Sequence, residues 1–599
     1  YAPGATERSS TTLQILGPPE DARVRTRWPR RDLQDTPLVW LGTNGRGAMT
    51  HTPIRWGTLY SRYDALLAAN LDPDVPEDRW IMLTRMRAWV VFQGYSQEVR
   101  HDCLESFHYD SETQATWHFH IPTGQGQSIH LNIAMRMRPL SNTVQVMFSR
   151  TPAEQVPNNG LPNDQPVRLI VRPDIEDRNF HTTTKAYLGP ENHYPASVRP
   201  ESAGFTFQPD PQRRLRMTAS RGDYVHEPEW AYMVHRPLEA ERGLEADSDL
   251  FSPGYFTTLL AGGEEQVITA RAITGKGPAA DMTGEPQLPG DPIDTPEEPI
   301  LPDLALRQAI LQFIVKRGDF ATVIAGYPWF LDWGRDTLIV CRGMVAAGMT
   351  DMVGEIVQQF AAFEDGGTLP NMIRGNDAGN RDTSDAPLWL FVVCRDLLRE
   401  GHGDILEVTC GRRHLREVLS DMGDALCRGT SNGIRMDPES ALLYSPSHFT
   451  WMDTNHPAGT PREGYPVEIQ ALWYAALSFL SGIDKTGGPW STLAKKVRRS
   501  IHTYFPMKSE GYLADCLCAG PDTPVPEAEQ DDALRPNQLF AITLGAINNK
   551  KLCRSMLDTC QALQRPRQAD EGLLRRILLG LSCRNYQSCA EAIPEAFGL

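Results

Sequence analysis

The residues with the clearest chemical potential form one short segment, which runs from Gly326 to Thr337 and mixes Trp, Tyr and Phe with charged side chains. Its aromatic rings suit the apolar C–H face of a pyranose. Asp332, Arg335 and Asp336 suit the sugar hydroxyls, because charged groups make strong hydrogen bonds. A simpler interpretation is that Asp336 or Thr337 only caps the helix that follows. Capping does not explain so dense a mixture, so the segment indicates a sugar-binding site.

A second polar segment, residues 376–385, ends where an apolar helical pattern begins. Asp385 lies at that start, ahead of Leu388, Trp389 and Phe391. A carboxylate at the first turn of a helix is either a functional group or only a helix cap. The sequence alone leaves both interpretations of Asp385 open.

Three later segments repeat the mixture of aromatic and charged residues, at 449–453, 460–468 and 535–540. Their side chains include Trp451, Asp453, Arg462 and Glu468.

The elements that must position these segments change character along the chain. Residues 37–275 read as antiparallel β-structure, because apolar and polar residues alternate with a period of two and turns with Pro and Gly separate the runs. The alternating apolar positions are Trp117, Phe119, Ile121, Ile129, Leu131, Ile133, Val144, Val146 and Phe148. We therefore expect a β-sandwich. His118, His120 and His130 fall on the opposite side of these strands, and we interpret them as an outward face rather than a metal site.

Helical periodicity takes over in the second half. Residues 1–36 resemble a tail or the remnant of a linker, and residues 276–302 are so rich in Pro, Gly and acid that they predict a linker. After it, amphipathic helices are expected from Asp303 to near Gly318, from Asp351 onward, and over about 386–399, 467–481 and 537–548. Residues 303–599 are expected to form a toroid of helices whose loops build a site at one end.

Length and composition narrow the class of protein. A chain of 599 residues exceeds what one core usually supports, so at least two domains are expected. The net charge of −16 argues against a nucleic-acid partner. No apolar run is long enough to span a membrane. The eleven scattered cysteines predict reduced thiols and a cytoplasmic location. No phosphate-binding glycine loop and no metal-ligand spacing appears, so neither cofactor nor metal is expected.

In this order the polar segments resemble the signatures of the amylo-α-1,6-glucosidase half of glycogen debranching enzymes. Residues 325–337 resemble that family's A-G-Y-P-W-F-x-D-W-G-R-D-T, and residues 385–389 its D-A-x-L-W. Residues 460–473 are similar to T-P-R-x-G-x-P-V-E-I-x-A-L-W, and residues 535–541 to R-P-N-Q-L-F-A. Residues 41–47 and 61–67 are similar to the T-N-G-x-G and R-Y-x-x-L-L of the N-terminal β-domain that accompanies the bacterial type.

The resemblance implies a β-sandwich followed by an (α/α)6 barrel, and hydrolysis of α-1,6-linked glucose with inversion. It implies a branched α-glucan, glycogen or limit dextrin, as the partner. By resemblance the general acid is Asp385, with Asp336 as the competing assignment. Arg335 and Asp336 would then grip the terminal glucose. The other substrate-binding residues implied are Trp329, Asp332, Trp333, Trp451, Asp453, Arg462 and Glu468.

The general base has no secure counterpart, because the pattern is lost after about Gln564 and the Y-H-x-G-x-x-W-P-W type of segment is not found. Glu595 is the candidate base, from a faint match at residues 592–598. The alternative is a divergent or incomplete barrel, since only about three hundred residues follow the linker. That alternative predicts a non-catalytic α-glucan-binding protein or fragment. Long bacterial members carry an amylase-like domain upstream, which would suit a chain that starts at Tyr1.

Overall fold

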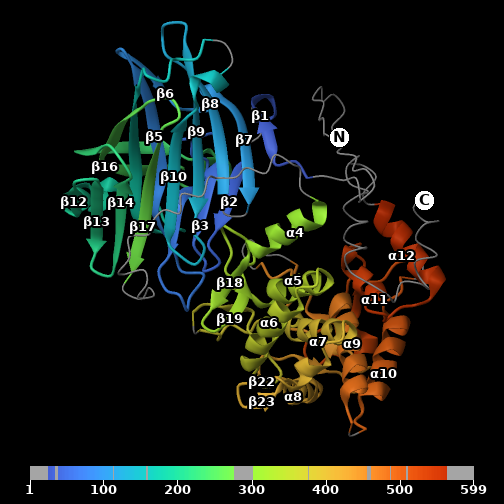
Figure 1. The fold of residues 1–599 in the computed structure, drawn as a ribbon. Helices are drawn as coiled ribbons and strands as arrows, with labels where there is room; N and C mark the ends of the chain where they lie inside the picture. Colours follow the sequence, from blue (N-terminus) through green and yellow to red (C-terminus); the bar gives the residue numbers. More distant parts are fainter. Residues whose placement is uncertain are drawn as a thin grey trace. The chain divides into compact units, whose positions relative to one another are not determined.

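The computed structural model describes residues 24–33, 38–111, 114–156, 159–274, 301–375, 377–454, 460–485, 487–507 and 510–562. The chain divides into two compact units, of which the first ends at Leu331 and the second begins at Asp332. Figure 1 colours the first unit from blue to yellow-green and the second from yellow to red. The predicted linker 276–302 lies almost wholly outside the described residues, so the domain boundaries stay a prediction.

Two antiparallel sheets form most of the first unit (Figure 1). The first sheet, in spatial order and among the described residues, consists of β1 (Arg27–Pro29), β7 (Leu104–Ser111), β8 (Gln114–Pro122), β9 (Ser128–Met137), β10 (Thr143–Arg150), β17 (Glu265–Thr274), β14 (Arg213–Ala219), β13 (Gly204–Asp210) and β12 (Val198–Glu201). The second consists of β15 (Asp223–His235), β16 (Asp247–Leu260), β11 (Val167–Asn179), β5 (Arg79–Phe92), β4 (Ala65–Asn70), β3 (Met49–Pro53) and β2 (Val39–Thr43), with β6 (Tyr95–Glu98) paired to β5.

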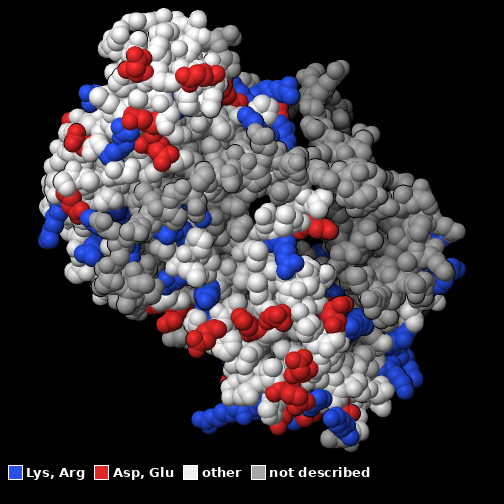
Figure 2. Space-filling model, in the orientation of Figure 1, with Lys and Arg blue, Asp and Glu red and all other residues white. Residues whose placement is uncertain are grey.

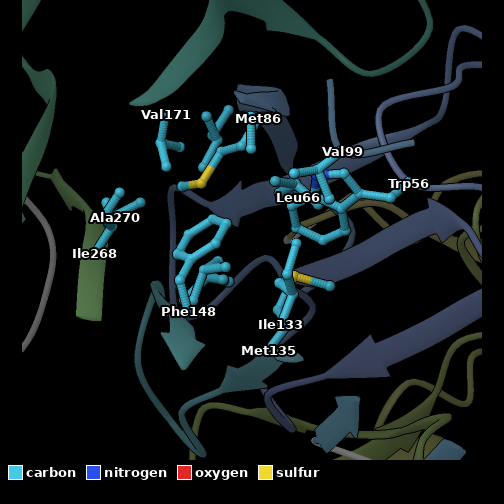
Figure 3. Packing of buried hydrophobic residues seen from close by; sticks show 14 of the residues in the cluster. Trp56, Leu66, Met86, Val99, Ile133, Met135, Phe148, Val171, Ile268 and Ala270 are labelled. Carbon is cyan, nitrogen blue, oxygen red and sulfur yellow. The ribbon is translucent and has the colours of Figure 1, made fainter. Parts of the chain in front are cut away.

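The hydrophobic core of this unit is built from the apolar faces of both sheets. Figure 3 shows Ile133 and Phe148 of the first sheet packed with Leu66, Met86 and Val171 of the second. The alternation predicted for β8, β9 and β10 is confirmed, because each apolar position named there is at most 1% exposed. The β-sandwich expected from the sequence is therefore present.

The three histidines on β8 and β9 lie on the other face of the first sheet, as predicted. His120 is exposed, and His118 and His130 are partly exposed. His118 Nδ1 lies 2.9 Å from Asn132 Oδ1. Among the residues that the structure describes, no group of three or more His, Cys, Asp or Glu side chains could hold a metal ion.

The smaller elements of the first unit are short helices and one hairpin. They are η1 (Arg30–Asp32), η2 (His101–Cys103), η3 (Ala153–Gln155), η4 (Ala186–Leu188), α1 (Pro190–Ala196), α2 (Pro237–Glu241), α4 (Pro302–Leu311), β18 (Ile314–Arg317) and β19 (Phe320–Val323).

The helix predicted from Asp303 to near Gly318 is wrong in its second part. Helix α4 ends at Leu311, and β18 and β19 form a hairpin around Gly318, whose φ is +56°. Glycine adopts that left-handed conformation without strain, so the turn is allowed there. Ile314 belongs to a strand because the residues on both sides of this turn pair with each other.

Helices dominate the second unit. They are α5 (Gly334–Ala346), α6 (Thr350–Ala362), α7 (Asp385–Arg399), α8 (Leu415–Arg428), α9 (Val467–Ile483), α10 (Trp490–Tyr504), α11 (Leu539–Thr543) and α12 (Lys550–Ala562), with η5 (Gly403–Glu407), η6 (Val525–Glu527) and η7 (Pro536–Gln538). Short strands join them: β20 (Asp332–Trp333), β21 (Met372–Ile373), β22 (Thr409–Cys410), β23 (Arg413–His414), β24 (Arg435–Met436), β25 (Leu443–Tyr444), β26 (Gly464–Pro466), β27 (Cys516–Cys518) and β28 (Glu529–Asp531).

Helix α9 is the centre of this unit. It is buried on nearly all sides and packs against α7, α8, α10 and α11, as expected for a helix that is apolar all round. The helices predicted from Asp351 and over 386–399 and 467–481 are confirmed as α6, α7 and α9. The helix predicted over 537–548 is wrong, because only η7 and the single turn of α11 form there.

The surface carries both signs of charge. On the face drawn in Figure 2, acidic and basic side chains are interspersed over the described residues. None of the described helices is both long enough and apolar enough to cross a membrane.

Candidate active site

A close backbone contact positions the segment that the sequence singled out first. Strand β20 pairs with β21, and the N–H of Gly334 donates to the carbonyl of Asn371 at 2.9 Å. A Cβ atom at Gly334 would lie 2.5 Å from the carbonyl oxygen of Pro370. Only glycine fits this approach, which sets where helix α5 begins and where Arg335 lies.

The guanidinium of Arg335 joins two carboxylates that are far apart in the sequence. Its Nε donates to Asp385 at 3.0 Å, and its Nη2 donates to Asp453 at 3.2 Å. Arg335 is 8% exposed and Asp385 only 2%, whereas the side chain of Asp453 is 32% exposed. Arg335 therefore organises a cluster of carboxylates with one open side, at Asp453.

Asp336, next to this arginine, is a carboxyl group with an altered pKa. Burial raises the pKa of Asp336, and the charges of Asp385 and Asp453 raise it further, while Arg335 and the backbone N–H of Asp336 oppose the shift. Asp336 therefore keeps its proton up to a higher pH than an ordinary aspartate does.

Asp385 is held firmly by the residues that precede it. Thr383 Oγ1 donates to one carboxylate oxygen of Asp385 at 2.7 Å, and Arg335 occupies the other. The N–H of Ser384 donates to the carbonyl of Phe449 at 2.7 Å, which ties the start of α7 to the loop before Trp451. The N-cap position of α7 is Ser384, whose side chain makes no capping hydrogen bond among the described residues, and Asp385 is the first residue of the helix.

A second charged cluster is completely buried. Arg462 forms a bidentate ion pair with Glu468, with an Nη2–Oε2 distance of 2.6 Å, and donates from Nε to Asp515 at 2.7 Å. Burial raises the pKa of Glu468, although Arg462 opposes this shift. Burial alone would lower the pKa of Arg462, but the carboxylates of Glu468 and Asp515 raise it above its usual range. These groups satisfy one another and leave no free hydrogen-bonding edge for a ligand.

The buried cluster supports the loop that carries Trp451 and Asp453. Arg462 Nη1 donates to Thr450 Oγ1 at 3.3 Å. Trp451 Nε1 donates to Asn537 Oδ1 at 3.0 Å, and the indole is 48% exposed. The two charged clusters are thus linked through residues 449–453.

The structure brings together four of the predicted residues, Arg335, Asp336, Asp385 and Asp453, with Trp333 half-buried beside them on β20. Asp332 is fully buried, and Thr337 Oγ1 lies 3.4 Å from its carboxylate. Trp329 belongs to the first unit, where it is 48% exposed and its ring lies 6.4 Å from that of Tyr63. Glu595 lies outside the described residues.

No role could be predicted from the sequence for Thr383, Asp515 or Asn537. Thr383 and Asn537 lie inside the polar segments 376–385 and 535–540, but the sequence does not show which side chains they contact. Asp515 stands alone before β27 with no pattern around it, and only the folded chain brings it to Arg462.

Comparisons with known proteins match both halves of the chain. Residues 308–567 match the family model of amylo-alpha-1,6-glucosidase, and residues 39–267 match that of the glycogen debranching enzyme N terminal. Together these matches cover most of the chain. No curated protein matches it.

Several solved structures are similar at low identity. One is a bacterial glucoamylase complexed with acarbose, with a TM-score of 0.48 and 10% identity over 93% of this chain and 81% of that one. Another is a rhamnosidase from Klebsiella oxytoca with rhamnose bound, with a TM-score of 0.32 and 9% identity over 65% of this chain and 75% of that one. A third is a family 76 glycoside hydrolase from a bovine Bacteroides thetaiotaomicron strain, with a TM-score of 0.30 and 11% identity over 59% of this chain and 75% of that one.

Proposed function

The chain belongs to the glycogen debranching enzyme family, and from this premise we propose that it hydrolyses α-1,6-linked glucose at branch points of glycogen or a related α-glucan. The observation that carries the proposal is the carboxylate cluster around Arg335. It combines a buried guanidinium, three aspartates and a half-exposed tryptophan on a neighbouring loop. Such a set can hydrogen-bond the hydroxyls of a glucose ring and supply a proton to the oxygen that leaves.

The proposed reaction inverts the anomeric carbon. A protonated carboxyl gives its proton to the leaving oxygen, and a carboxylate base takes a proton from the water that attacks the opposite face of the sugar. The two carboxyl groups must then lie roughly 6.5–9.5 Å apart, whereas a retaining enzyme holds them only about 5–5.5 Å apart. Glu595 is the proposed base.

Two assignments of the proton donor compete. The family resemblance favours Asp385, but both of its oxygens already accept hydrogen bonds from Arg335 and Thr383. The environment of Asp336 favours that residue, because burial raises its pKa and a general acid has to hold a proton near the working pH. We therefore propose Asp336 as the proton donor. Asp385 then fixes the orientation of Arg335, whose guanidinium grips the glucose.

The remaining predicted residues divide into contacts and supports. Trp333 and Trp451 are proposed as walls of the glucose site, and Asp453 as a polar contact, since all three are at least partly exposed. Trp329 belongs to the first unit, and its role in substrate binding stays a prediction from the sequence. Asp332, Arg462 and Glu468 are buried, and we propose that they act as supports of the loops rather than as direct contacts to the sugar.

The finer features of the wider protein are proposals of the same kind. We propose that the helices of the second unit belong to an (α/α)6 barrel and that the protein works in the cytoplasm.

Release of free glucose from a glycogen limit dextrin tests the function. A linear maltodextrin is the control, because it has no α-1,6 bond. Glucose from the limit dextrin alone is the expected result. Retardation of the protein by glycogen in a native gel without any glucose release would replace the hydrolase with a glucan-binding protein.

A further inference from the structure

A buried amide holds the half-exposed indole of Trp451. Trp451 as a whole residue is 48% exposed, while Asn537, which accepts the indole N–H at 3.0 Å, is only 3% exposed. An exposed tryptophan normally has freedom to change rotamer. Here the single polar atom of the ring is tied to a group in the protein interior.

The orientation of that amide is determined by its own partner. Asn537 Nδ2 donates to Asp515 Oδ1 at 2.8 Å. The other oxygen of Asp515 accepts from Arg462 and from Arg535, each at 2.7 Å. Because Asp515 is acceptor-only as a carboxylate, it selects the NH₂ side of the amide and leaves Oδ1 free to accept the indole N–H.

We propose that Asn537 is a positioning residue, which fixes the Trp451 indole as a stacking platform for a glucosyl ring of the substrate. The inference rests on the proposed function and extends it. Trp451 precedes by two residues Asp453, whose carboxylate pairs with Arg335. The amide therefore sets the platform and the adjoining carboxylate in one fixed arrangement before substrate arrives. A glucosyl ring binds more tightly to a platform that is already ordered, because the tryptophan side chain then loses less conformational entropy on binding.

The test is a double-mutant cycle on the one hydrogen bond between these two residues. Trp451→Phe keeps a ring and removes the donor, and Asn537→Ala removes the acceptor. Each is expected to raise KM for the limit dextrin, and the Kd for glycogen in affinity electrophoresis, roughly 2- to 12-fold, while kcat changes less. The Kd of the double variant for glycogen is expected to be no higher than that of the weaker-binding single variant, because both changes break the same hydrogen bond.

Trp473→Phe is the matched control. Its indole N–H also makes a hydrogen bond, to the carbonyl of Ala441 at 3.1 Å, but its ring is fully buried in α9. It is expected to leave KM and Kd unchanged. If Asn537→Ala does not fold, a Trp451→Phe variant that binds like the wild type still overturns the positioning role, since it leaves the Asp515 network intact.

Additive effects of the two changes, or a Trp451→Phe variant that binds like the wild type, would overturn the positioning role. Glycogen binding without glucose release would overturn the proposed hydrolase and leave the platform testable by Kd alone. A wild-type protein that glycogen does not retard would overturn the platform itself.

Discussion

Arg335 donates from Nε to a carboxylate oxygen of Asp385 at 3.0 Å, across fifty positions of sequence. Both side chains are buried, and Thr383 occupies the second oxygen of Asp385. An arginine held in this way keeps its remaining N–H groups directed at Asp453 and at the open side of the cluster. The pair joins two segments that are separate in the sequence into one cluster of charged side chains.

The roles proposed for Asp336 and Asp385 predict different responses of the two variants to the leaving group of the substrate. Asp336→Asn is expected to lower kcat for the limit dextrin by about 10²–10⁴, because the proton donor is lost. The same variant is expected to hydrolyse α-glucosyl fluoride at close to the wild-type rate, since fluoride leaves with little help from an acid. Asp385→Asn is expected to impair both substrates, with a raised KM, because Arg335 loses its partner.

Rates on the two substrates, measured side by side for Asp336→Asn, Asp385→Asn and Asp453→Asn, check this assignment. Preserved fluoride hydrolysis in the Asp385 or Asp453 variant, and not in the Asp336 variant, would move the acid to that residue.

The raised pKa of Asp336 also predicts a pH-dependent stability. A carboxyl whose pKa is higher in the folded chain stabilises the fold while protonated, and this contribution is lost as the pH rises through the folded pKa. At pH 7 the unfolded chain releases this proton more readily than the folded chain, which disfavours folding, so Asp336→Asn is expected to be more stable than the wild type. The difference is expected to shrink as the pH falls toward about 4. Urea midpoints at several pH values measure it. If the wild type is instead more stable than Asp336→Asn at pH 7, the attraction between Arg335 and the ionised Asp336 carboxylate is larger than the cost of burying that charge.

Gly334 and Gly343, both in α5, give a matched pair. Gly334→Ala is expected to cost about 1–3 kcal/mol, because the new Cβ would lie 2.5 Å from the carbonyl of Pro370. It is also expected to lower activity, since the start of α5 carries Arg335. Gly343→Ala meets nothing within 4 Å and is expected to stabilise the helix by roughly 0.5–1 kcal/mol. Denaturation and glucose release are measured for both, and equal losses in the two variants would contradict the close contact at Gly334.

The buried pair of Arg462 and Glu468 predicts a large loss of stability when one partner is removed. Arg462→Met is expected to cost roughly 3–5 kcal/mol, because Glu468 is left buried without its counterion. Replacing both residues, as Arg462→Met with Glu468→Leu, is expected to recover much of that loss. Denaturant midpoints compare the two variants. A double variant that is less stable than the single one would show that the pair contributes more than mutual neutralisation.

Periodic features of the fold could be predicted from the sequence. The alternation in β8, β9 and β10 identified the core face, since a strand that packs on one side must alternate. Helices α6, α7 and α9 followed from their apolar spacing. The stretch after Leu311 could not be predicted in this way, because Phe313 and Ile314 fit a helical face as well as a strand. Only the pairing around Gly318 separates the two.

The sequence predicted several residues of the candidate site, but it did not predict the contacts between them. Motif order pointed to Arg335, Asp336 and Asp385, but nothing in the sequence shows that Arg335 occupies one oxygen of Asp385. In the same way, the motifs pointed to Arg462 and Glu468, but they do not show the ion pair between these two side chains or their burial. Such pairings depend on long-range packing, which the local pattern does not contain.

The anomer of the glucose first released from a limit dextrin tests the central claim most directly. Proton NMR during the first minutes, with enough enzyme to outrun mutarotation, distinguishes the two anomers. We expect β-glucose from the wild type, since inversion at the anomeric carbon converts an α bond into a β product, and no glucose from a variant that lacks the Arg335 cluster. Release of α-glucose would contradict inversion, and the absence of any glucose would contradict the hydrolase.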